Sequence, residues 1–215
     1  MIHSTTNKLI MKRKIIYYVL TIFITALTVR STDAQTIQRK TETNKTIKET
    51  KAMQNQNFTT TFLVDKTPEE VFNAINNVSS WWSGEIIGNT DKLNDVFIYH
   101  FEDIHSCKVK ILEMVPDKKV VWLILENDFN FTKDKTEWVN TKVVFDIGSQ
   151  GDKTSLTFTH IGLVPSYECY ETCHQGWTHY IQNSLKKYID TGKGEPNMTG
   201  SPQTEAEKKL SSSKL

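Results

Sequence analysis

Apolar and polar residues alternate along six short segments between residues 85 and 161, and turn residues separate the segments. The alternation is clearest at Val139, Thr141, Val143, Phe145 and Ile147, and it is typical of a strand with one buried face. The breaks at residues 116–118 and 148–152 are short enough for hairpin turns, which make neighbouring strands antiparallel. The segments lie near residues 85–88, 96–102, 105–115, 119–126, 137–147 and 154–161. The pattern predicts an antiparallel meander.

A strand and a helix are predicted before the meander. The β-branched and aromatic run 58–64 predicts a first strand. Thr67 then offers an N-cap hydroxyl, Pro68 stands at the first helical position, and Glu70 completes a capping box. A short second helical turn is expected at residues 77–82.

A long helix is predicted after the meander. Apolar residues recur every three or four positions from Tyr170 to Ile189, Pro165 introduces the segment, and Gly192 is the expected stop. This stripe and the buried face of the sheet each need a partner. We therefore expect the helix to close the concave side of the sheet.

The periodic pattern is confined to residues 57–196, which form one predicted domain of ordinary size. Residues 35–56 and 197–215 are rich in Lys, Thr, Gln, Glu and Ser and poor in large apolar residues. Such segments bury too little surface to offset the entropy of ordering. They are predicted to be a disordered linker and a disordered tail.

The N-terminal residues 1–34 have the order of a signal peptide. Basic residues precede an apolar run at 15–29, and small residues lead to a cleavage site after Ala34. The run is shorter than the ~20 residues that span a bilayer, so no stable membrane anchor is expected. With this segment the protein is exported, to the periplasm or beyond. The alternative is translation from Met53, which gives a cytoplasmic protein.

Charge and motifs narrow the function classes. The chain has 26 basic and 25 acidic residues, which does not favour nucleic acid as a partner. Cys169, Cys173, His174 and His179 do not converge on one helix face, so no metal site is predicted. No phosphate-binding loop or nucleophile elbow occurs. We therefore predict no catalytic residue and no cofactor.

Local sequence adds a family resemblance. The segments 67–72, Trp81-Trp82 and 176–194 resemble the START-like, or SRPBCC, superfamily, in the branch named for the activator of heat shock protein 90 ATPase. The resemblance implies an α+β helix-grip fold: a curved antiparallel sheet of six to seven strands around a long C-terminal helix, with two short helices after the first strand. It also implies a cavity between sheet and helix.

Nine residues are predicted to line that cavity: Trp81, Trp82, Tyr99, Trp122, Phe145, Phe158, His160, Trp177 and Ile181. Trp81 and Trp82 are neighbours on a short helix and are not expected to enter the same core, so one of them is placed at the cavity mouth. The alternative is that one lies in the core and the other is a partly exposed cover for the helix. The alternative for the rings is that they fill the interior, because protein cores leave few voids. The alternative for His160 is a core histidine hydrogen-bonded to backbone.

Three functions follow from these expectations. The first is non-catalytic binding of a small, largely apolar molecule. The second is a polyketide cyclase-like or hydrolase-like enzyme in which His160 and a tyrosine, Tyr99 or Tyr170, transfer protons. The third is a co-chaperone-type interaction module that contacts a chaperone through its outer surface, which is an analogy of fold.

Overall fold

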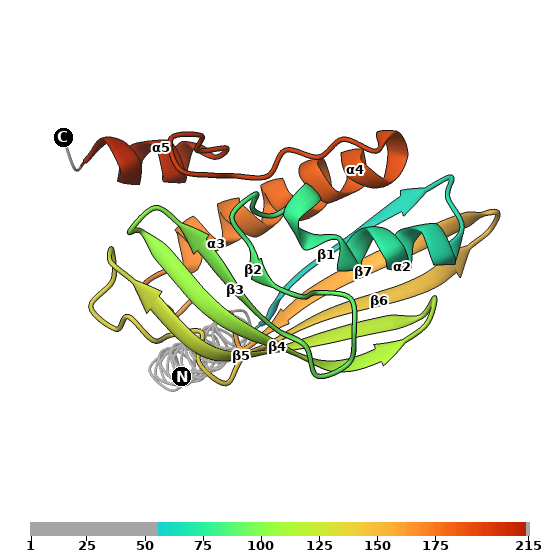
Figure 1. The fold of residues 1–215 in the computed structure, drawn as a ribbon, viewed down its shortest axis with the longest axis horizontal. Helices are drawn as coiled ribbons and strands as arrows, with labels where there is room; N and C mark the ends of the chain where they lie inside the picture. Colours follow the sequence, from blue (N-terminus) through green and yellow to red (C-terminus); the bar gives the residue numbers. More distant parts are fainter. Residues whose placement is uncertain (1–55, 214–215) are drawn as a thin grey trace, which may run out of the picture. The chain divides into compact units, whose positions relative to one another are not determined.

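Seven strands form one antiparallel sheet in the order β1-β7-β6-β5-β4-β3-β2 (Figure 1). The computed structural model describes residues 56–213. The strands are β1 Phe58–Val64, β2 Ile87–Gly88, β3 Val96–Phe101, β4 His105–Val115, β5 Lys119–Phe129, β6 Lys142–Gln150 and β7 Lys153–Ile161. Strands β2 to β7 are neighbours in chain order, and β1 closes the sheet by pairing with β7. The predicted antiparallel meander is confirmed.

Two short helices follow β1, as predicted. Helix α2 spans Pro68–Asn76, and a single 3-10 turn, η1, spans Val78–Ser80. The capping box at the start of α2 is present: the Thr67 main-chain N–H donates to Glu70 Oε2 over 2.8 Å, and the Glu70 N–H donates to Thr67 Oγ1 over 3.2 Å. Both otherwise orphaned N–H groups are thereby satisfied.

The long C-terminal helix consists of three consecutive stretches: α3 Tyr170–Trp177, the π-helical η2 Thr178–Leu185 and α4 Lys186–Thr191. It lies on the same side of the curved sheet as α2 (Figure 1). Its predicted stripe is buried at Cys173, Trp177, Ile181 and Leu185. The helix ends at Gly192, whose φ of 75° is a left-handed conformation that glycine adopts without strain. The predicted helix-grip fold is confirmed.

The helix begins later than Pro165 predicts, because side chains from elsewhere in the chain define its start. One carboxylate oxygen of Glu137 accepts from the N–H of Glu168 over 2.6 Å, and the other accepts from the N–H of Cys169 over 2.8 Å. These bonds satisfy donors that a helix N-terminus leaves unpaired. Helix α3 therefore starts at Tyr170.

The alternation that predicted a strand from residue 137 is misleading before Lys142. Residues 135–140 form turns, and Asn140 has a left-handed φ of 66°. The N–H of Thr141 donates to the carbonyl of Trp138 over 2.9 Å. This turn directs Trp138 into the core and leaves Val139 half-buried.

The prediction of a disordered tail is wrong for residues 197–213. Helix α5 spans Glu205–Ser212 and starts with a second capping box, between Thr204 and Glu207. Asn197 and Glu207 are buried. The segment is polar in composition, and it is held by hydrogen bonds to buried side chains of the domain, which composition does not reveal.

The predicted signal peptide and nearly all of the predicted linker lie outside the described residues. Among residues 56–213 no helix is both long and apolar enough to cross a bilayer.

Candidate ligand pocket

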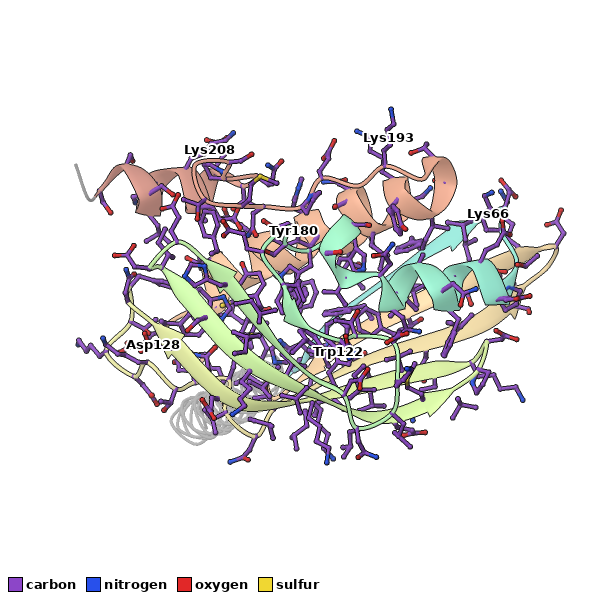
Figure 2. The ribbon with its side chains drawn as sticks, in the orientation of Figure 1. Lys66, Trp122, Asp128, Tyr180, Lys193 and Lys208 are labelled. Carbon is purple, nitrogen blue, oxygen red and sulfur yellow. The ribbon has the colours of Figure 1, made fainter. Side chains whose placement is uncertain are left out.

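Stacked aromatic rings fill the centre of the space between sheet and helix. The Trp81 and Trp122 rings lie 6.2 Å apart at 13°, and the Trp82 ring lies 4.2 Å from that of Tyr99 at 15°. Trp122 comes from β5 in the middle of the sheet (Figure 2). Phe145 meets Trp122 edge-on, with ring centroids 4.8 Å apart. Offset-stacked and edge-on geometries are those that aromatic pairs favour.

Trp81 and Trp82 both enter this core, which corrects the prediction that one of them lies at a cavity mouth. Both side chains are buried. Their rings stack at 18° with centroids 6.3 Å apart. The prediction assumed that the helical turn includes both tryptophans. The 3-10 turn η1 instead ends at Ser80, and Trp81 follows it as a turn residue with φ −137° and ψ −26°. The bend of the backbone at Trp81 lets the Trp81 and Trp82 side chains both point into the core.

His160 is a core histidine in the described structure. Trp177 Nε1 donates to His160 Nδ1 over 2.9 Å, so the remaining proton is on Nε2, which lies 2.8 Å from Thr141 Oγ1. The Thr141 hydroxyl in turn donates to the Trp138 carbonyl over 2.6 Å. Burial, with a smaller contribution from His105, lowers the pKa of His160 to about 3. The ring is therefore neutral and both its nitrogens are engaged.

A pocket of about 50 Å³ lies to one side of the filled centre. It is larger than the space of a single water molecule and smaller than the pocket of a drug-sized ligand. Its first wall belongs to β3, β4, β5 and the turns that follow them: Tyr99, Phe101, Ile104, His105, Phe129, Phe131 and Trp138.

The second wall is helical. The C-terminal helix contributes Thr172, Cys173, Gly176, Trp177 and Tyr180, and the α5 segment contributes Thr204, Glu207 and Leu210. A Cβ atom added to Gly176 would have no neighbour within 4 Å. The absence of a side chain at Gly176 therefore leaves part of the pocket open.

A buried polar network borders the pocket where α5 meets the helix. The Tyr180 hydroxyl donates to Glu207 Oε1 over 2.5 Å. Asn197 Nδ2 donates to the same oxygen and to the Tyr99 hydroxyl, both over 2.9 Å. Glu207 Oε2 accepts from the N–H groups of Gln203 and Thr204, over 2.7 Å and 3.0 Å. The network joins β3, the helix and α5.

The two tyrosines of the network stay protonated. Burial raises the pKa of Tyr99, and the neighbouring Glu207 charge raises it further. Burial likewise raises the pKa of Tyr180, with Tyr99 and Glu207 adding to the effect. Loss of a proton would place a second negative charge beside a carboxylate in a poorly solvated site.

His105 places an imidazole ring in the pocket wall. Its Nε2 lies 3.0 Å from Asn127 Oδ1, while Asn127 Nδ2 donates to the Lys135 carbonyl over 2.7 Å. Oδ1 is thus the acceptor, and His105 Nε2 carries the proton. Burial lowers the pKa of His105 to about 3, so the ring is neutral.

Two of the nine predicted cavity residues, Tyr99 and Trp177, line this pocket. The other seven belong to the packed centre and are buried there: Trp81, Trp82, Trp122, Phe145, Phe158, His160 and Ile181. The prediction missed His105, Trp138 and Glu207. For Glu207 a signal was present in the sequence, since Thr204-x-x-Glu207 is a capping-box pattern.

Within residues 56–213, no group of three His, Cys, Asp or Glu side chains is arranged to hold a metal ion. The pocket wall instead combines aromatic rings with a few neutral polar groups and one carboxylate. Such a surface suits a small organic molecule.

The sheet that grips a long C-terminal helix defines a START-like protein of the helix-grip class. The chain belongs to the family described as Activator of Hsp90 ATPase homolog 1-like protein, whose model matches residues 65–190. This confirms the predicted branch. The pocket residues of the α5 segment lie beyond the matched range.

Solved structures share the fold at low sequence identity. The solution structure of the Aha1 dimer from Colwellia psychrerythraea has a TM-score of 0.52 and 21% identity, over 65% of this chain and 99% of that one. Protein MLL2253 from Mesorhizobium loti has a TM-score of 0.50 and 12% identity, over 62% of this chain and 96% of that one. No curated protein matches the chain.

Proposed function

We propose that the domain binds a small, largely apolar molecule, without catalysis, in the pocket between β3–β5, the C-terminal helix and α5. The observation that carries the proposal is that seven of the fifteen lining residues are Phe, Tyr or Trp, around open space beside Gly176. Aromatic walls with a few placed polar groups are typical of ligand pockets. The pocket has about 50 Å³ of interior space and is partly open to solvent, so it holds a small apolar group whose ligand can extend toward the surface.

The enzyme hypothesis is less well supported. It requires His160 to exchange a proton with a tyrosine and substrate, but Trp177 and Thr141 engage both ring nitrogens of His160. A general base needs a free nitrogen within reach of the reacting proton. The co-chaperone hypothesis would use the outer surface and gives no role to the pocket.

Two measurements test the binding proposal. Native mass spectrometry of the full chain, purified under mild conditions, is expected to reveal a retained small molecule, or the small apolar probe 3,3-dimethyl-1-butanol added to the protein is expected to bind with one-to-one stoichiometry. Gly176→Leu is expected to abolish binding because its side chain occupies the open space. Gly176→Ala is the matched control, since it removes the same glycine and adds only a methyl group. Binding that survives Gly176→Leu, or no binding of any kind to the wild-type chain, refutes the proposal.

We also propose that the chain is exported, on the strength of the basic, apolar and small-residue order of residues 1–34. N-terminal sequencing of the protein from its own host tests this proposal. A mature end at Gln35 supports it, and an end at Met53 refutes it.

A further inference from the structure

Glu207 is a buried carboxylate in the wall of the pocket. The residue is 8% exposed. All four of its hydrogen-bond donors are neutral: the Tyr180 hydroxyl, the Asn197 amide and the N–H groups of Gln203 and Thr204. No ion pair to Glu207 forms within the described part of the chain. Buried charges are normally paired, because burial without a counter-charge is costly.

The remaining ionisable groups of the wall do not supply the missing positive charge. Burial lowers the pKa of His105 to about 3, so its ring is neutral at physiological pH. Burial raises the pKa values of Tyr99, Tyr180 and Cys173, which are also neutral. The only formal charge on the wall is therefore negative. It disfavours an anionic ligand, such as a carboxylate, and favours a cation.

The aromatic rings favour the same kind of ligand. Rings from both walls surround the space: Tyr99, Phe129 and Trp138 from the sheet side, and Trp177 and Tyr180 from the helix. Tyr180 lies between the sheet and the layer formed by the C-terminal segment (Figure 2). The face of an aromatic ring attracts a cation, and desolvation strengthens that attraction to ~2 kcal/mol or more.

We propose that the pocket binds a small organic cation, such as a methylated amine, whose charge pairs with Glu207 and whose methyl groups contact the aromatic wall. The proposal rests on the ligand-binding function proposed above and specifies the class of ligand. A metal ion does not fit, because hard cations take six or more oxygen ligands and the Glu207 oxygens already accept four hydrogen bonds.

The decisive test compares three probes of similar size and different charge on the full chain. They are choline, its uncharged carbon isostere 3,3-dimethyl-1-butanol, and the anion 3,3-dimethylbutanoate, with tryptophan fluorescence or NMR shifts as the readout. Choline is expected to bind at least about tenfold more tightly than the isostere, and the anion is expected not to bind. Equal binding of choline and the isostere, or tighter binding of the anion, overturns the proposal.

Two variants locate the effect. Glu207→Gln removes the charge but keeps the capping box, because glutamine also serves at this position. This variant is expected to bind choline and the uncharged isostere about equally, so that the tenfold preference for choline is lost. Glu205→Gln makes the same charge change at an exposed position of the same helix and is expected to leave the preference intact. An unchanged preference in Glu207→Gln overturns the proposal.

Phe131→Leu provides a further variant that leaves the network untouched. It replaces a half-buried ring of the wall with an aliphatic side chain, so it is expected to weaken choline binding more than binding of the isostere. Equal weakening of both probes counts against a cation–ring contact. If 3,3-dimethyl-1-butanol binds the wild-type chain and is excluded by Gly176→Leu while choline does not bind, the ligand-binding function stands and the cation assignment fails.

Discussion

The hydroxyl of Tyr180 and the carboxylate of Glu207 form a hydrogen bond of 2.5 Å that ties the C-terminal helix to α5. The bond links two segments 27 residues apart and closes one side of the pocket. Since α5 has few apolar side chains, this polar contact is a main determinant of its position.

We expect Tyr180→Phe to loosen α5 without unfolding the domain. The substitution removes one donor from a buried carboxylate, which costs about 1–3 kcal/mol. Limited proteolysis is expected to cleave the variant within residues 198–213 faster than the wild type. Tyr188→Phe removes a hydroxyl that accepts from the exposed Asn77 side chain and is expected to have little effect. Equal cleavage rates in wild type and Tyr180→Phe would contradict the role assigned to this bond.

Gly176→Ala is expected to stabilise the domain. The residue lies inside α3, and a methyl group there meets no neighbour within 4 Å. Replacing glycine by alanine inside a helix contributes about 1 kcal/mol. Urea denaturation measures the gain. A loss of stability would show that the space beside Gly176 is filled in solution.

Stability is expected to fall as the pH decreases from about 6.5 toward 3, in part because of His160. The folded pKa of about 3 lies below the unfolded value near 6.5, so the unfolded chain binds the proton more readily in this interval. The contribution is fully present above the unfolded pKa, and each pH unit below it costs about 1.4 kcal/mol for this group.

Urea denaturation of wild type and His160→Gln at pH 7, 6 and 5 tests this expectation. The variant is expected to be less stable at pH 7, because Trp177 and Thr141 lose their partner. Its dependence on pH is expected to be shallower by about 1.4 kcal/mol per unit. Parallel pH profiles for the two proteins would mean that His160 binds a proton equally readily in the folded and the unfolded chain.

Glu137→Ala is expected to fray the start of α3. The carboxylate accepts from two N–H groups ahead of Tyr170, and loss of a capping residue costs about 0.5–2 kcal/mol. Hydrogen exchange is expected to accelerate at residues 168–173 in the variant and to remain unchanged in β6. Uniform acceleration across the domain would point instead to global destabilisation.

Local signals in the sequence predicted the elements and their order. The capping box at Thr67 and Glu70, the strand alternation and the stripe on the last helix all depend on neighbours a few residues apart. The start of α3 at Tyr170 depends on Glu137, more than thirty residues earlier, so Pro165 alone was a poor guide.

The pocket was harder to predict than the fold. Side chains on the inward face either meet or leave space, and sequence does not distinguish these outcomes. Phe145 and Phe158 meet other rings in the centre, whereas Tyr99 and Trp177 also border open space. Trp138 was missed because the turn at Asn140 breaks the strand alternation that was used to assign inward-facing residues. Glu207 was missed because the sequence around it is polar and predicted a disordered tail.

The pocket is encoded by two stretches of chain that can change separately. The matched range 65–190 supplies β3–β5 and the lining residues of the C-terminal helix, and a short appendage beyond it supplies Thr204, Glu207 and Leu210. A substitution at Thr204, Glu207 or Leu210 therefore changes the pocket wall outside the matched range, whereas the packed rings of Trp81, Trp122 and Phe145 lie within it. In a protein built this way, the lining of the pocket can vary in one short segment while the scaffold stays the same.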